Sequence, residues 1–310
     1  MPADLALAVD LGGTKVEAAL VDPFGRVLDG TRCRQPTGST SGSDDIADSV
    51  RSVLAGSLAA LPTGATLLGV GIGAAGPLRQ AEGLVSPLNL PSWRDFPLAE
   101  LAAECVPDTA VTLRIDGLCI TLAEHWIGAG QDCPNLMGMV VSTGIGGGLI
   151  LGGHTVSGPT GNAGHIGHVE VAGFDDDCLC GGNGCLEAVA SGPRSVAWAR
   201  AQGWVGSTGE ELASSYATGD EIAHAAVERA GRAIGRAIGS AASLVDLDIV
   251  AIGGGFSRIT PDLFDHIRAG IGEHTSFDYV QKVSVVPSAL SDEGPLIGAA
   301  ALVHRADILG

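Results

Sequence analysis

Positive charge is scarce in this chain. Of its 310 residues, 17 are Lys or Arg and 35 are Asp or Glu, so the formal net charge is -18. A surface this acidic repels phosphate backbones and anionic lipid headgroups, and we therefore expect neither a nucleic acid nor a membrane as partner. Lysine occurs only as Lys15 and Lys282, which draws attention to Lys15 because it lies in a glycine-rich loop.

Signals for export and for membrane insertion are also lacking. The first residues, MPADLALAVD, have no basic region before an apolar run, which predicts that no signal peptide is present. No apolar stretch approaches the length of a membrane span. The cysteines number seven, and three of them are clustered, which suits metal binding in a reducing compartment better than a disulfide framework. These features predict a soluble cytoplasmic protein.

Glycine, in contrast, is abundant, with 47 copies that gather in clusters and indicate loops built from bare backbone. Three apolar runs each end in such a cluster, and we predict a strand at each run. After the first two clusters we predict a second strand, at VEAALVD and at LILGG. The runs are 5–9 (ending at Asp10, before LGGTK), 136–142 (before TGIGGG) and 247–252 (before GGG).

Segments with helical periodicity alternate with these strands. One of them, 221–245, carries Gly231, Gly235 and Gly239 at four-residue spacing, which we interpret as a face where another element packs closely. With 45% apolar residues, the chain predicts an α/β fold of two domains that face each other across a cleft. We expect helices at 45–60, 98–105, 117–129, 221–245 and from Pro295. The expected domains are 1–115 with the C-terminal helix 295–310, and 116–294.

The first glycine loop carries groups that bind phosphate. It runs from Asp10 through Gly12, Gly13 and Thr14 to Lys15, and it offers successive amides, a hydroxyl and an ammonium group after a strand. The Asp10 carboxylate suits a hydrated Mg²⁺ that also contacts the phosphates. Taken alone, such a loop could equally be a tight hairpin.

Two further loops strengthen the prediction. Thr143-Gly144 offers a second hydroxyl and amide, and Gly253, Gly254 and Gly255 leave bare backbone against which a nucleoside can lie. Because all three loops follow strands, we predict a nucleoside triphosphate with magnesium as their common ligand.

A G-x-G-x-x-G pattern at 71–76 has a different interpretation. The dinucleotide-binding motif requires a helix directly after it, whereas Pro77 and the run containing Gly83 predict a turn and a hairpin. The sequence also contains no phosphate-binding P-loop pattern. We therefore predict no dinucleotide site.

A candidate metal site is formed by His168, Cys178, Cys180 and Cys185, which lie within eighteen residues. Three sulfurs and an imidazole are the donors of a closed tetrahedral zinc site, and the C-x-C-x4-C spacing lets the sulfurs face one point. Buried or disulfide-bonded cysteines, or redox or acyl-transfer chemistry, are the alternatives. A zinc ion here would also fix Glu187 and shape a substrate site without taking part in the chemistry.

Asp116 follows VTLRI and precedes the helix expected at 117–129. An aspartate there is commonly just a helix cap, and the functional alternative is a general base that deprotonates a hydroxyl attacking a phosphorus. Other polar side chains in Gly- or Pro-flanked turns could hydrogen-bond the hydroxyls of a sugar. These are Asn89, His165, His168 and Glu187.

The motifs DLGGTK, GAAGP, SPLNLPSW, VSTGIGGG, GNAGHIGH, CLCGGNGCLEAVASG and VAIGGG occur in the order typical of the ROK family of sugar kinases and repressors. The chain resembles that family from about residue 5 to residue 303. The resemblance implies an actin-like (ribonuclease H-like) two-domain fold, MgATP on the three loops and a structural zinc ion. It implies Asp116 as the base, and His168 as both zinc ligand and sugar contact. We add Gly76 of GAAGP to the predicted sugar-binding residues.

Two departures from the family pattern bear on the sugar. Family glucokinases usually carry Glu where this chain has His165. The resulting motif GHIGH resembles that of the N-acetylmannosamine kinases. An imidazole can bind an acetamido group where a carboxylate would compete. Ile115 replaces the usual Asn before the base and removes one expected sugar contact.

We therefore predict ATP-dependent phosphorylation of the 6-hydroxyl of a hexose or N-acetylhexosamine, with N-acetylmannosamine first. Glucose or another hexose as substrate, polyphosphate as donor, and a catalytically silent sugar sensor remain alternatives. Because no helix-turn-helix segment precedes Asp10, a kinase is expected and not a repressor. Family members often form dimers or tetramers, and we expect a homo-oligomer.

Overall fold

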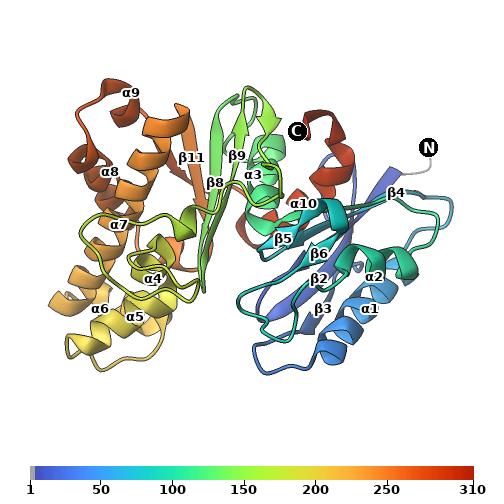
Figure 1. The fold of residues 1–310 in the computed structure, drawn as a ribbon, viewed down its shortest axis with the longest axis horizontal. Coiled ribbons are helices and arrows are strands. Elements are labelled where there is room, and N and C mark those ends of the chain that lie inside the picture. The colour runs from blue at the N-terminus through green and yellow to red at the C-terminus, as the bar shows by residue number, and fades with distance from the viewer. Residues whose placement is uncertain (1–3) are drawn as a thin grey trace. The chain divides into compact units, whose positions relative to one another are not determined.

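The computed structural model describes residues 4–310, which form two compact units of mixed sheets and helices (Figure 1). The first unit ends at Asp132 and also contains Gly148–Gly164 and Leu290–Gly310, and the second contains Cys133–Gly147 and His165–Ala289. By compactness alone, the helix after residue 115 belongs with the first unit. The predicted functional division at 115/116 stays a prediction.

The strands are β1 (Asp4–Leu11), β2 (Lys15–Val21), β3 (Cys33–Pro36), β4 (Thr66–Ala74), β5 (Leu78–Arg79), β6 (Leu84–Val85), β7 (Val111–Ile115), β8 (Leu136–Val141), β9 (Ile145–Leu151), β10 (His154–Thr155), β11 (Ile249–Gly253) and β12 (Ser284–Pro287). The α-helices are α1 (Ser43–Ala59), α2 (Leu98–Cys105), α3 (Asp116–Ile127), α4 (Leu186–Ala190), α5 (Gly192–Ala201), α6 (Gly209–Ala217), α7 (Glu221–Val245), α8 (Asp262–His274), α9 (Asp278–Gln281) and α10 (Gly294–His304). None of the helices described between residues 4 and 310 is long and apolar enough to cross a membrane.

The first sheet has the order β3-β2-β1-β4-β7, and β1, β4 and β7 run parallel. Both faces of β1 are buried, so its sequence is almost continuously apolar. Leu5, Leu7 and Val9 face a core shared with α1 and α2, whereas Ala6 and Ala8 face α10. The small residues on that second face allow α10 to lie close to the sheet.

Gly71 explains the G-x-G-x-x-G pattern. A Cβ on Gly71 would collide with the carbonyl of Ala299 in α10, so the glycine is needed for packing. The pattern is followed by the β5–β6 hairpin, as Pro77 and Gly83 predicted.

The second sheet has the order β10-β9-β8-β11-β12, with β8, β11 and β12 parallel. The expected start of the second strand was wrong. We predicted a strand at LILGG, after the glycines, whereas β9 begins at Ile145 and includes Gly148. A Cβ on Gly148 would lie 2.5 Å from Leu118 Cα and 2.8 Å from the carbonyl oxygen of Gly117. The glycine therefore lets the strand pass directly over the start of α3.

Each predicted helix is present, whereas the sequence analysis did not predict α4, α5, α6, α8 and α9. The segments 98–105 and 221–245 are α2 and α7, and the expected helices at 45–60 and 117–129 are α1 and α3 with shifted ends. The expectation that another element approaches the α7 glycines is confirmed at Gly231 and Gly235, because α8 packs against both.

Replacing Gly235 with Ala is expected to destabilise the protein by about 2 kcal/mol, because overpacking outweighs the gain in helix propensity. The added Cβ would lie 2.9 Å from both Gly270 Cα and Ile271 N, and closer still to the Ile267 carbonyl. Urea unfolding measures the change. Gly272→Ala in α8 is the control, since nothing lies within 4 Å of its Cβ position, and it should be neutral or stabilising. Equal effects of the two substitutions would contradict the packing role.

Candidate functional site

In the first unit, predicted site residues meet at the carboxyl ends of adjacent parallel strands. Leu11 of β1 lies opposite Ala74 of β4, which in turn lies opposite Ile115 of β7. Asp10, near the end of β1, and Asp116, directly after β7, are close enough for each charge to affect the other. Open α/β sheets bind ligands at this edge.

Gly76 and Asn89 lie beside the same strand ends. The backbone N–H of Ala75 donates to the carbonyl of Leu11 (3.1 Å), which holds the segment leading into Gly76 against the end of β1. A Cβ on Gly13 would lie 2.6 Å from Asn89 Cγ, so the Asn89 side chain packs directly on the glycine loop. That loop consists of Gly12, Gly13 and Thr14, and Lys15 begins β2.

The charged form of the Asp10 carboxyl is disfavoured by its surroundings. Burial raises its pKa from 3.8 to about 7, with a further contribution from the negative charge of Asp116, although Lys15 opposes the shift. A hydrated Mg²⁺ bound to Asp10 would offset both effects. The donor set therefore fits the predicted magnesium ion.

The raised pKa of Asp10 predicts a pH-dependent effect of Asp10→Asn. Between pH 4 and 7 the folded protein holds the proton more tightly than the unfolded chain, so this carboxyl lowers stability as the pH rises through about 7. Without metal or nucleotide, the variant should exceed the native protein in unfolding free energy at pH 8, on the order of 2 kcal/mol, and much less at pH 5. Urea unfolding at both pH values measures this. A gain independent of pH would contradict the assignment.

Three cations surround one buried carboxylate beside the loop, an arrangement that the sequence did not reveal. Glu17 is 2% exposed and pairs with Lys15 (3.1 Å), Arg32 (2.9 Å) and Arg34. Burial alone would raise the pKa of Glu17, but hydrogen bonds from Arg32 and Lys15 outweigh it and hold the pKa below its usual value. Arg32 also acts on Asp10. The ion pair with Glu17 thus holds Lys15 beside the glycine loop.

Asp116 is the first residue of α3, and its Oδ1 accepts a hydrogen bond from the N–H of Gly117 (2.7 Å). The preceding Ile115 is 2% exposed and belongs to the hydrophobic core. One turn later, burial raises the pKa of the Cys119 thiol well above its usual value, and the charges of Asp116 and Asp10 act in the same direction. Both carboxylates therefore lie near the buried first turn of α3.

In the second unit, the other two predicted loops follow neighbouring parallel strands. Val140 of β8 lies opposite Gly253 of β11, so Thr143-Gly144 and the glycine triplet begin side by side. Gly254 has φ +98°, and a Cβ there would collide with the carbonyl of Val141. Gly255 follows it directly. These two loops can thus present backbone amides to one ligand.

Glu187 is fixed against the first of these loops. Its Oε2 accepts a hydrogen bond from the N–H of Ile145 (2.8 Å) and lies 2.5 Å from where a Cβ on Gly144 would be. Gly167 packs against the carbonyl of Ile145, the first residue of β9. This contact anchors the 3-10 turn Ile166–His168 against the strand. The loop, Glu187 and the histidine turn are therefore contiguous.

The four predicted metal ligands converge. One donor atom each from His168, Cys178, Cys180 and Cys185 lies within 4.8 Å of all the others. Cys178 Sγ is 3.7 Å from His168 Nδ1, and Cys180 Sγ is 3.7 Å from Cys185 Sγ. Zinc–sulfur bonds of 2.3 Å in a tetrahedron place two sulfurs about 3.8 Å apart. The residues therefore fit a zinc ion.

His165 has an unmet hydrogen-bonding capacity. Its Nε2 is buried and has no partner, and its ring centroid lies 5.7 Å from that of His168. Burial lowers the pKa of His165, and so does His168, which keeps the ring neutral near pH 7. A buried polar atom without a partner is costly, and a ligand that bonds this nitrogen would remove the cost.

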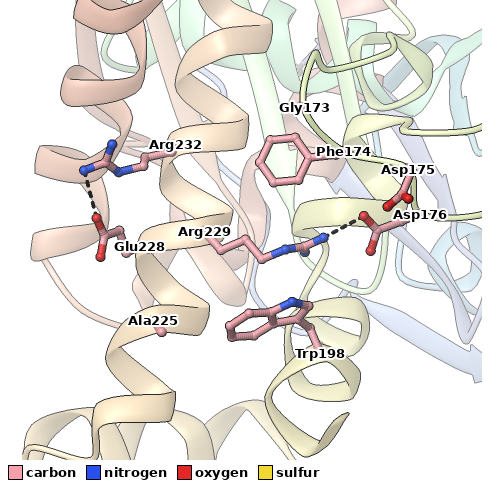
Figure 2. A pocket seen from close by; sticks show the side chains of 9 residues that line it. All are labelled: Gly173, Phe174, Asp175, Asp176, Trp198, Ala225, Glu228, Arg229 and Arg232. Atoms are coloured by element: carbon pink, nitrogen blue, oxygen red, sulfur yellow. Dashed lines mark hydrogen bonds and ion pairs between the residues drawn. The ribbon is translucent and has the colours of Figure 1, made fainter. Parts of the chain in front are cut away.

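Arg229 of α7 is a second residue that sequence reasoning missed (Figure 2). Its guanidinium group lies between the rings of Phe174 and Trp198, with distances of 5.1 and 5.5 Å to the two centroids. It also pairs with Asp176 (2.6 Å) and donates to the carbonyl of Val189 (2.7 Å). One side chain thereby ties the start of the cysteine loop to α4, the helix that carries Glu187. No local sequence signal marks this role, since the partners are far apart in the chain.

The model of the ROK family matches residues 6–306. The chain is 30% identical to a glucokinase of Thermotoga maritima, over 98% of this chain and 99% of the relative. It is 32% identical to an N-acetylmannosamine kinase of Escherichia fergusonii, over 80% of this chain and 82% of the relative.

Among solved structures, the fold is similar to a ROK family glucokinase from Streptomyces griseus in complex with glucose and AMPPNP. The TM-score is 0.83 at 28% identity, and the match covers 97% of this chain and 99% of that one. The expected actin-like α/β architecture is thereby confirmed.

Proposed function

Because the chain belongs to the ROK family, we propose that it is an ATP-dependent kinase that phosphorylates the 6-hydroxyl of a hexose or N-acetylhexosamine. The observation that carries this proposal is the position of Asp10 and Asp116 at the carboxyl ends of β1 and β7, the two strands that flank β4, with the glycine loop and Asn89 beside them. That arrangement supports a phosphate-binding group and a base for a hydroxyl within one unit. We further propose a cytoplasmic homo-oligomer that binds neither nucleic acid nor membrane.

Each residue has a stated task in this proposal. Asp116 orients the attacking hydroxyl and accepts its proton, while Lys15 and the amides of Gly12 and Gly13 bind phosphate oxygens. Magnesium, when bound at Asp10, neutralises charge on the phosphates. The sugar is held by Gly76, Asn89, His165, His168 and Glu187. Nucleotide contacts from the second unit are assigned to Thr143, Gly144, Gly253, Gly254 and Gly255.

N-acetylmannosamine is the proposed first substrate, and the support is the unpartnered Nε2 of His165. A neutral imidazole can donate to or accept from an acetamido group, whereas a glutamate offers only acceptors. Relatives named N-acetylmannosamine kinase and glucokinase have similar identity to this chain, so the choice depends on this one side chain. Burial of Ile115 in the core supports retained sugar binding despite the departure there.

The test is ADP release with MgATP against N-acetylmannosamine, glucose, mannose and N-acetylglucosamine, for the native protein and for His165→Glu. In the native protein we expect N-acetylmannosamine to give the highest kcat/KM. His165→Glu should lower the ratio of kcat/KM for N-acetylmannosamine to kcat/KM for glucose by at least ~10-fold. His154→Glu, at an exposed position in β10, is the control. A preference for glucose in the native protein would overturn the proposed substrate but leave the proposed kinase activity standing. Sugar binding by calorimetry without ADP formation would favour a sensor.

A further inference from the structure

A polar cavity lies in the first unit, against the outer strand of its sheet. It has a volume of about 520 Å³ and borders β7, which has only one neighbouring strand in the sheet order. None of its lining residues belongs to the proposed kinase site. The polar ones are Gln80, Glu82, Thr112 and Arg114.

Arg114 brings an incompletely bonded guanidinium group to this cavity. Its Nη1 donates to the carbonyl of Leu113 (2.9 Å), whereas Nε is buried and has no hydrogen-bond partner. No ion pair involves Arg114 in the part of the chain that the structure describes. Burial lowers the pKa of Arg114, as expected for a cation without a counter-charge. The Nε–Nη2 edge is the one that binds carboxylates and phosphates through two parallel hydrogen bonds.

Gln80 adds a complementary acceptor. Its Oε1 is also buried without a partner, so it can accept a hydrogen bond from a hydroxyl group. The one carboxylate of the lining, Glu82, pairs with Arg79 (3.4 Å), which offsets its repulsion of an anion. The cavity lining thus combines a guanidinium group whose Nε has no partner with an amide oxygen that also has none, and an oxyanion carrying a hydroxyl group offers a partner to each.

We propose that this cavity binds a small hydroxylated oxyanion, with its phosphate or carboxylate on the Nε–Nη2 edge of Arg114 and a hydroxyl on Gln80. The proposal is independent of the kinase reaction, because it uses neither the glycine loops nor Asp116. The bound anion would lie on the strand that leads directly into Asp116, two residues beyond Arg114.

Titration with glucose 6-phosphate, gluconate, inorganic phosphate and neutral glucose tests the site in the full chain. Binding is followed by calorimetry and by the ¹⁵N–¹H signal of the Arg114 Nε, assigned from its loss in Arg114→Lys. We expect an anion, but not glucose, to shift this signal, and Arg114→Met to weaken the binding component by at least ~10-fold. Arg114→Lys keeps the charge and the aliphatic stem, so we expect it to fold even where Met does not, and to bind the anion more weakly than the native protein.

Arg51→Met is the matched control, since Arg51 is a surface arginine of α1 paired with Asp48, and its affinities should equal those of the native protein. Binding of glucose 6-phosphate and not gluconate would assign a phosphate ester, and the reverse would assign a carboxylate. An anion affinity unchanged in both Arg114 variants, or an Arg114 Nε signal that stays in place at saturation, would overturn the proposal. Phosphate bound at the glycine loop can be told apart from phosphate bound in the cavity, because only the first of these binding events should persist in Arg114→Met.

Discussion

Asp116→Asn is expected to lower kcat by roughly 10²–10⁴-fold while leaving the affinity for the sugar nearly unchanged. The amide keeps the size of the side chain and its hydrogen bond from Gly117 N, which is 2.7 Å long in the native protein. It cannot accept the proton of the attacking hydroxyl. Because the lost interaction forms fully only in the transition state, kcat should fall and the dissociation constant should not.

The decisive measurement pairs single-turnover ADP formation with calorimetric titration of the sugar. Asp220→Asn is the matched control: Asp220 lies at the start of α7, as Asp116 lies at the start of α3, and its side chain accepts a hydrogen bond from Ala223 N (2.8 Å). If Asp116 were only a helix-capping residue, both substitutions would leave turnover intact. Turnover of the Asp116 variant within a few-fold of the native rate would remove it from the role of base.

Features whose partners are close in sequence could be predicted from the sequence. The cysteine cluster and the first glycine loop are of this kind, since a few residues fix their geometry. Pro77 and the run containing Gly83 were enough to reject the dinucleotide motif at 71–76, because they predicted a turn and a hairpin where that motif requires a helix. The structure adds the positive reason, which is the close packing of α10 at Gly71.

Features that depend on register or on distant partners could not be predicted. Ile115 was expected to replace a sugar contact, yet which face of β7 a residue occupies depends on the pairing with β4, and that pairing places Ile115 in the core. The pairing of Glu17 with Arg32 and Arg34 needs the β2–β3 register, in which Glu17 lies opposite Arg34. Arg229 acts on segments about 40 and 53 residues away, where no local pattern points to it.

Loss of the metal from the cysteine cluster is the other change expected to have a large effect. Cys178→Ser should abolish stoichiometric zinc, lower the Tm by roughly 10 °C and raise the KM for the sugar by at least ~10-fold. The reason is connectivity: Cys185 directly precedes α4, which carries Glu187, and His168 ends the turn that starts after His165. One ion bound to Cys185 and His168 would therefore fix the sugar-binding residues on both sides of it.

Metal analysis, thermal unfolding and steady-state kinetics measure these three effects, and Cys105→Ser is the control because Cys105 is a partly buried thiol outside the cluster. The kinetic pattern separates a structural ion from a catalytic one. A structural ion acts through Glu187 and His168, so its loss should raise KM more than it lowers kcat, and saturating sugar should restore most of the rate. Collapse of kcat at saturating sugar in a folded variant would instead place the metal in the chemistry. Full activity without zinc would show that the loop holds its shape through other contacts, of which the Arg229 pair with Asp176 is the strongest candidate.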